Sequence, residues 1–317
     1  SHYVPKGGGK GRGGQREYRS REDYRRANIA SYQETLSYIT SPLTPDFPAK
    51  KPLLFTTELL QEHVLQDELE RRYPNMTVVI VNRDTLDTAE DELRAGTTSD
   101  KIMILNMASK YKPGGGVKSG SQAQEEVIGR RSNLMVLLPE PLYESELKND
   151  QVILVRDMTI VKGSDEKIIP EEKMYTVNML ACAAVKIYQN DTHKYITRDP
   201  DGHDIYKGSR FRNIMEMKIN NIFMTAYFQG YDTLVLGAIG CGAYNNPPKE
   251  ITAIFLKYLE IYRNCFKKVV FAVLSKNDDN FSWFHDCVQE PYEQNTRKIQ
   301  DRAAKETASK GKDKGKK

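Results

Sequence analysis

Continuous apolar runs alternate with helical patterns along most of this 317-residue chain. Five runs predict strands that are buried on both faces, because few polar residues interrupt them. They are residues 77–82, 101–107, 174–184, 232–239 and 268–274. Such strands are typical of a sheet that helices cover on both sides.

Helical spacing of apolar residues marks the segments between these runs. The first helix is expected over residues 21–39, where Ile29, Tyr32, Leu36 and Ile39 recur on one face. Further helices are expected at residues 58–72, 124–138, 210–228 and 250–262. Together the elements predict one α/β domain over residues 22–290, a three-layer α/β/α sandwich around a mainly parallel or mixed sheet with an N-terminal helical extension.

Charge is distributed unevenly around this domain, although the whole chain carries only +4. Residues 1–30 hold eight basic and three acidic residues, residues 297–317 hold nine and three, and the remainder holds 30 and 37. We expect residues 1–20 and 297–317 to be disordered basic arms that contact a polyanion, either nucleic acid or the substrate. Arms that merely keep the protein in solution are the alternative.

The cysteine pattern and the apolar runs limit the cellular setting. The four cysteines lie far apart, without a C-x-x-C pair, so we expect reduced thiols and neither a disulfide framework nor a metal site. No run approaches the roughly 20 residues of a membrane span, and the first residues contain no apolar signal segment. The sequence therefore predicts an intracellular protein, cytoplasmic or nuclear, without membrane contact.

Two glycine-rich loops follow predicted strands and precede predicted helices. The first contains Pro113-Gly114-Gly115-Gly116 and the second contains Gly240-Cys241-Gly242-Ala243-Tyr244. Ligands bind at the carboxyl ends of strands in open α/β sheets, and glycines let backbone N–H groups approach a diphosphate. Neither loop has the spacing of a dinucleotide-binding or P-loop motif, which disfavours a redox enzyme and an NTPase.

Adjacent glutamates, Glu125 and Glu126, begin the helix after the first loop. Neighbouring helix positions point roughly 100° apart, so the two carboxylates do not flank one bond as in a standard glycosidase pair. One glutamate is therefore expected to act first as acid and then as base, while the other binds. Arg130 lies four residues after Glu126, and we expect it to point elsewhere because an ion pair would lower the pKa of a working acid.

The first loop with its glutamates resembles the signature of microbial-type poly(ADP-ribose) glycohydrolases. The matching residues are Pro113-Gly114-Gly115-Gly116, seven further residues, Gln124-Glu125-Glu126 and then Arg130-Arg131-Ser132. The second loop, the segment from Val81 to Leu86 and the last predicted strand are similar as well, so the likeness spans about residues 22–288. The resemblance implies a macrodomain-like catalytic domain that hydrolyses the ribose–ribose O-glycosidic bond without cofactor or metal.

The resemblance also implies roles for individual residues. Glu126 would protonate the leaving ribose hydroxyl and then activate water, and Glu125 would hold the distal ribose. The implied substrate contacts are Asn106, Gly114, Gly115, Gly116, Gln124, Gly240, Cys241, Gly242, Ala243, Tyr244 and, for the adenine amino group, Asp84. A monomer is expected, with poly(ADP-ribose) or an ADP-ribosylated protein as its partner.

The chain departs from the family pattern at two places. Ser109 stands where many macrodomains carry a second asparagine, and Met179-Leu-Ala-Cys182-Ala-Ala replaces a proline-containing stretch. His193 and His203 lie in a polar insertion, where a surface role is expected. The alternative functions are an ADP-ribose-binding reader, which needs no acid, and a hydrolase of single ADP-ribose units on protein.

Overall fold

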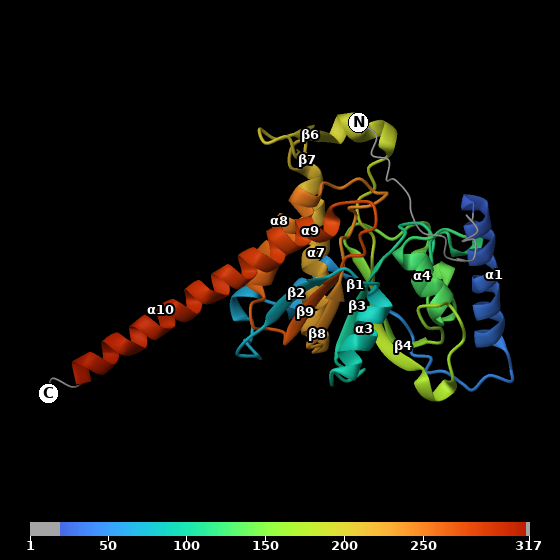
Figure 1. Cartoon of the computed structure of the whole chain (residues 1–317), viewed down its shortest axis with the longest axis horizontal. Helices are drawn as coiled ribbons and strands as arrows, with labels where there is room; N and C mark the ends of the chain where they lie inside the picture. Colours follow the sequence, from blue (N-terminus) through green and yellow to red (C-terminus); the bar gives the residue numbers. More distant parts are fainter. Residues whose placement is uncertain (1–19, 315–317) are drawn as a thin grey trace, which may run out of the picture.

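A computed structural model describes residues 20–314, with side chains as far as residue 310. Its centre is a seven-stranded sheet in the order β1-β4-β5-β3-β8-β9-β2. Figure 1 shows this sheet with helices on either side. Only β4 runs against the other strands, so the sheet is mixed, as predicted. The strands are β1 Leu53–Thr56, β2 Thr77–Val81, β3 Ile102–Met107, β4 Gln151–Ile160, β5 Tyr175–Cys182, β8 Thr233–Leu236 and β9 Lys268–Ala272.

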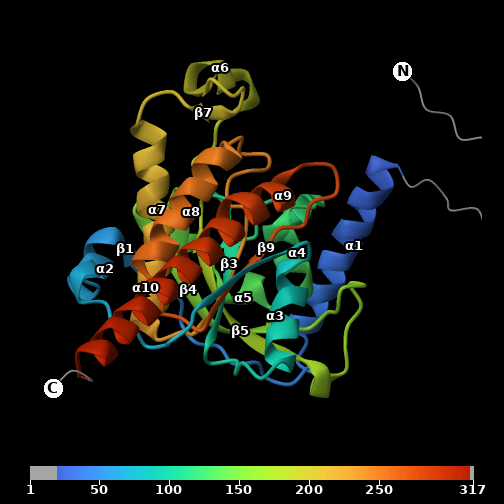
Figure 2. The same ribbon diagram turned by 60° about the vertical axis from the view of Figure 1, so that its left-hand side comes forward.

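Helices cover both faces of this sheet and leave a separate hairpin outside it. The hairpin pairs β6 (Ile196–Arg198) with β7 (Asp204–Tyr206), next to α6 (Figure 2). The helices are α1 Arg21–Thr40, α2 Thr57–His63, α3 Thr85–Arg94, α4 Gln124–Arg131, α5 Leu134–Leu137, α6 Thr192–Tyr195, α7 Arg210–Gln229, α8 Pro248–Ile261, α9 Asn280–Phe284 and α10 Glu290–Lys314. Short 3-10 or π turns occupy Gln66–Glu68, Val117–Ser119, Glu140–Tyr143, Glu171–Lys173, Gln189–Asp191 and His285–Gln289.

Side chains of β3 show how the sheet separates two cores. Met103 and Leu105 point into the core built with α7 and α8, whereas Ile102 and Ile104 point into the core built with α3, α4 and α5. This alternation follows from the two-residue period of a strand. The three-layer prediction is therefore confirmed, and the expected N-terminal helix is α1, which packs outside α4 (Figure 1).

Two predicted helices were too long. The helix expected over residues 58–72 ends at His63, because Arg71 and Arg72 draw the following segment across the ends of α7 and α8. The helix expected over residues 124–138 breaks at Ser132, which is extended and whose Oγ donates to the carbonyl of Ile128 and accepts from the N–H of Leu134. Strands β1, β4, β6 and β7 and helices α3, α6 and α9 were not predicted.

The basic tail differs most from expectation. Disorder was predicted for residues 297–317, yet α10 continues to Lys314 and projects from the body in Figures 1 and 2. Its first turns are anchored by Tyr292, which is 1% exposed and lies under the guanidinium of Arg263. Beyond that point Ala, Lys, Arg and Glu have high helix propensity, so a helix needs few buried side chains. The N-terminal arm, residues 1–19, lies outside the described residues.

Candidate active site

The two glycine loops meet at one edge of the sheet. They follow β3 and β8, which are adjacent and parallel, so their carboxyl ends lie side by side. A cavity of about 590 Å³ opens between them. Its walls include Gly115, Gly116, Gln124, Glu125 and Glu126 from the first loop and α4, and Gly240, Gly242, Ala243 and Tyr244 from the second loop. The juxtaposition predicted from the sequence is present.

Gly115 lies between the two glutamates. Its φ of +56° is a left-handed conformation that favours glycine, and a Cβ at this position would lie 2.9 Å from Oε1 of both Glu125 and Glu126. Gly116 donates its backbone N–H to Oε1 of Glu126 at 3.0 Å. The glycine loop therefore shapes the space around both carboxyl groups.

Glu125 is held on the β3 side of the cavity. Its Oε2 accepts from Nδ2 of Asn106 at 3.0 Å, and its Oε1 accepts from the N–H of Ser109 at 2.8 Å. Burial raises the pKa of Glu125 to about 8, against the opposing effect of these hydrogen bonds. The nearby charge of Glu126 contributes to this rise, and a pKa of about 8 means that the Glu125 carboxyl group is largely protonated at neutral pH.

Glu126 is held differently. Apart from the bond from Gly116, its side chain makes no hydrogen bond or ion pair within residues 20–314, and it lines the cavity although only 8% is exposed. The two side chains therefore diverge, one toward β3 and one toward Gly116, as the helix geometry predicts. Arg130 points away, as expected, and its guanidinium binds Glu166 at 2.9 Å and the carbonyl of Ser121 at 2.8 Å.

Asn106 does not lie where the resemblance implied. It is completely buried, is not part of the cavity wall and orients Glu125 instead. The reason is strand alternation, because Asn106 shares the face of β3 that packs on α4. Gln124 lines the cavity but commits its amide to Leu105, Met107 and Thr85, which ties α4 to β3.

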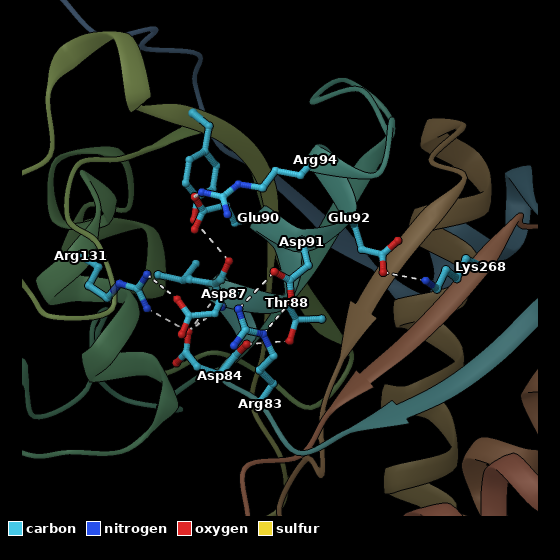
Figure 3. A network of polar contacts seen from close by, with 12 residues as sticks. Arg83, Asp84, Asp87, Thr88, Glu90, Asp91, Glu92, Arg94, Arg131 and Lys268 are labelled. Atoms are coloured by element: carbon cyan, nitrogen blue, oxygen red, sulfur yellow. Dashed lines mark hydrogen bonds and ion pairs between the residues drawn. The ribbon is translucent and has the colours of Figure 1, made fainter.

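Asp84 also has a structural task. Its carboxylate caps α3 through the N–H groups of Leu86 and Asp87 and accepts from Arg131 at 3.0 Å, within the network in Figure 3. It is absent from the cavity wall. A position after β2 placed Asp84 at the correct edge of the sheet, but the adjoining helix N-terminus uses its oxygen. The expected adenine contact is therefore not formed by the cavity wall.

Backbone donors are available in the second loop, with one exception. The N–H groups of Gly240, Gly242 and Ala243 make no hydrogen bond within the described chain, whereas that of Cys241 donates to the carbonyl of Ala238 at 3.1 Å. Cys241 also lies outside the cavity wall, so its expected diphosphate contact is not supported. Gly114 lies outside the wall as well, and its backbone hydrogen-bonds Glu125.

Among the wall residues that were not predicted as part of the site, two lysines and Ser109 contribute charge or a hydrogen bond. Lys112 and Lys186 add positive charge to the wall, and Nζ of Lys186 lies 5.4 Å from the ring centroid of Tyr244. The N–H of Ser109 holds Glu125 whatever side chain stands there. Both lysines could have been predicted as site residues. Lys112 precedes the glycines and Lys186 follows β5, so both lie at the carboxyl edge of the sheet, where ligands bind.

Metal ligation has little support in the cavity itself. Within residues 20–314, the groups of three or more His, Asp or Glu with suitable spacing are Asp199, Asp201 and His203, and His285, Asp286 and Glu290. Neither group lines the cavity. All four cysteines are free thiols, as predicted. Within the same residues, no helix has the length and apolar character that crossing a membrane requires.

Comparisons with known proteins agree with this arrangement. A family model for the catalytic domain of microbial-type poly(ADP-ribose) glycohydrolase matches residues 20–162, and curated proteins give no match. A structure of poly(ADP-ribose) glycohydrolase from Thermomonospora curvata with the inhibitor ADP-HPD has a TM-score of 0.65 at 21% identity, covering 83% of this chain and 99% of that one. The Deinococcus radiodurans enzyme in complex with ADP-ribose has a TM-score of 0.60 at 25% identity, covering 74% and 93%. Over residues 20–162 the chain is therefore similar to the catalytic domain of microbial-type poly(ADP-ribose) glycohydrolases, and its fold resembles theirs over most of its length.

Proposed function

We propose that this protein hydrolyses the ribose–ribose O-glycosidic bond of poly(ADP-ribose) and releases ADP-ribose, with Glu126 as general acid and base. The observation that carries the residue assignment is the difference between the two carboxyl groups. Both oxygens of Glu125 accept hydrogen bonds from Asn106 or Ser109, whereas Glu126 accepts one bond from Gly116. Glu126 therefore retains an oxygen that can exchange a proton with the substrate.

The other wall residues suit the rest of an ADP-ribose unit. The N–H groups of Gly240, Gly242 and Ala243 and the ammonium group of Lys186 would bind the diphosphate. Tyr244 and the protonated carboxyl group of Glu125 would hold the distal ribose, beside Gly115 and Gly116. Asn106 acts through Glu125 as a positioning residue in this scheme.

Two proton transfers through Glu126 complete the reaction. Its protonated carboxyl group donates to the leaving ribose oxygen as the bond to the anomeric carbon breaks. The resulting carboxylate then removes a proton from water as the water oxygen attacks that carbon. This proton transfer regenerates the acid form of Glu126. This scheme requires neither metal nor cofactor, so EDTA is expected to leave turnover unchanged.

Release of free ADP-ribose from poly(ADP-ribose) by the purified full chain tests the proposal. We expect Glu126→Gln to lower the turnover number by at least about 100-fold, the usual contribution of a positioned acid–base group, while ADP-ribose affinity measured by calorimetry stays within threefold. Glu140→Gln is the matched control, because its side chain is 72% exposed outside the cavity.

The alternatives give different results. ADP-ribose binding by the wild type without release would replace the proposal with the reader function. Activity only on single units attached to protein would favour the mono-ADP-ribosyl hydrolase. Loss of ADP-ribose binding in Glu126→Gln would give Glu126 a structural role. An intracellular setting, cytoplasmic or nuclear, is supported by the free thiols, and a monomeric state stays a prediction.

A further inference from the structure

A second cavity adjoins the active site. It has a volume of about 670 Å³ and lies between the first turns of α1 and the loop after the Val117–Ser119 turn. Ser121 and Gln122 line both this cavity and the one that contains the glutamates. The volume is within the range of roughly 300–1,000 Å³ typical of small-molecule sites. We call this second cavity the α1 subsite.

The position of the α1 subsite relative to Glu126 indicates which side of the scissile bond it faces. Glu126 is bound by Gly116, and a Cβ on Gly116 would lie 2.3 Å from Oγ of Ser121. Ser121 and Gln122 therefore lie on the Glu126 side of the cavity. The proposed diphosphate donors Gly240, Gly242 and Ala243 and the ring of Tyr244 come from the other loop. If the proposed function holds, a substrate unit bound to those donors would direct its leaving group past Glu126, toward Ser121 and Gln122.

The α1 subsite carries positive charge suited to phosphate. Arg21 and Arg25 line it, with Glu22 as the acid in its wall. Glu22 pairs with Arg25 at 3.9 Å and with Arg26 at 3.5 Å, and Arg26 does not line the cavity. Nε of Arg25 donates to the carbonyl of Ser119 at 2.8 Å, so its guanidinium is directed at this loop. Arg21 is exposed.

We propose that the α1 subsite binds the next unit of the polymer, on the leaving-group side of the scissile bond, with Arg21 and Arg25 contacting its phosphates. The inference rests on the proposed function, because it requires a substrate of at least two ADP-ribose units. Arginine suits this task, since its planar fork binds phosphate oxygens in pairs. The α1 subsite makes affinity depend on the polymer and not only on its terminal unit.

Arg21 is the residue to change, because Arg25 also holds Ser119. In the full chain we expect Arg21→Ala to raise KM for poly(ADP-ribose) about three- to fivefold, the effect of losing one exposed ion pair, without a change in kcat. The slope of log KM against log salt concentration is expected to decrease by about one, which corresponds to the loss of one phosphate contact. ADP-ribose affinity stays unchanged, and Arg21→Lys restores part of the loss.

Arg26→Ala is the matched control, with the same charge change on the same helix and outside the cavity. Equal KM values for the Arg21→Ala and Arg26→Ala variants would overturn the α1 subsite, because the effect would then be that of net charge. An equal loss of ADP-ribose affinity in Arg21→Ala would also overturn it. If the wild type releases no ADP-ribose, the proposed function fails. Release with an unchanged KM in Arg21→Ala rejects only the α1 subsite.

Discussion

Replacement of Glu125 by glutamine is expected to change how stability depends on pH. Burial raises the pKa of Glu125 from 4.5 to about 8. Below pH 4.5 this carboxyl group is neutral in the folded and unfolded states. As the pH rises toward 8, the unfolded state ionises first, so the folded state loses stability relative to it. Above pH 8 the loss is complete.

The magnitude follows from the shift. One pKa unit corresponds to about 1.4 kcal/mol, so a shift of roughly 3.5 units costs the wild type up to about 5 kcal/mol. Glu125→Gln has no charge to bury. Its amide also finds a partner, because Oδ1 of Asn106 has no hydrogen bond and accepts from the new NH2 group if the Asn106 amide turns over. The variant is therefore expected to gain stability over the wild type between pH 5 and pH 8.

Urea unfolding of both proteins at pH 5, 6, 7, 8 and 9 measures this difference in the free energy of unfolding. Titrations elsewhere cancel, because the two chains share every other group. Glu140→Gln, at an exposed glutamate, is expected to show a flat difference. A Glu125→Gln difference that stays within about 0.5 kcal/mol from pH 5 to pH 9 would refute the reasoning, since extrapolated values are reproducible to roughly 10–15%.

Two further predictions concern the glycine loop and the tail. Gly115→Ala places a methyl group between the two carboxyl groups, so kcat/KM is expected to fall at least tenfold. Gly96→Ala, also at a positive φ but with open space around it, is expected to leave activity unchanged. Equal activity losses in both variants would mean that backbone strain, not the methyl group, is responsible. Removal of residues 297–317 is expected to weaken polymer binding more at low salt than at high salt, as measured by fluorescence anisotropy. Identical affinities of the shortened and full chains at both salt concentrations would contradict a polyanion contact.

The sheet was largely predictable because its central strands are buried on both faces. Their apolar runs are uninterrupted, and the predicted order of strands and helices follows from them. Strand β4 was not predicted because its apolar run Val152–Val155 is short and is followed by Arg156 and Asp157 at a register shift. Asp157 has a φ of +54°, so the alternation of side chains breaks where the bulge inserts a residue.

The site was predictable as two loops and a pair of glutamates, but not in its hydrogen bonding. Asn106 and Asp84 lie at the predicted edge of the sheet, but neither side chain faces the cavity. The amide of Asn106 donates to Glu125, and the carboxylate of Asp84 accepts from the N–H of Leu86 at the start of α3. The orientation of Asn106 could have been predicted from the sequence. It follows Ile102 and Ile104 at two-residue spacing, so its side chain lies on the same face of β3, toward α4. For Asp84 the capping task depends on helix α3, which the apolar pattern did not reveal.

Helix α1 shows why an element with little buried surface still belongs to the catalytic domain. It buries only Tyr32 and Thr35 along its described length, so packing alone contributes little. Polar contacts hold it instead, because Asn28 donates to the carbonyl of Gly120 at 3.0 Å and Arg25 to that of Ser119 at 2.8 Å.

The same helix restrains the end of α4. The hydroxyl of Thr35 donates to the carbonyl of Arg130, and the buried ammonium group of Lys162 donates to the carbonyl of Ser31 at 2.9 Å. These contacts fix the segment between Gly116 and Arg130, which contains both glutamates. A shift of about 1 Å in a catalytic group can lower the reaction rate about 100-fold. The role of α1 is therefore to hold the segment between Gly116 and Arg130 in position. The match to the family model begins at residue 20, the N-cap of this helix, so α1 lies within the matched segment.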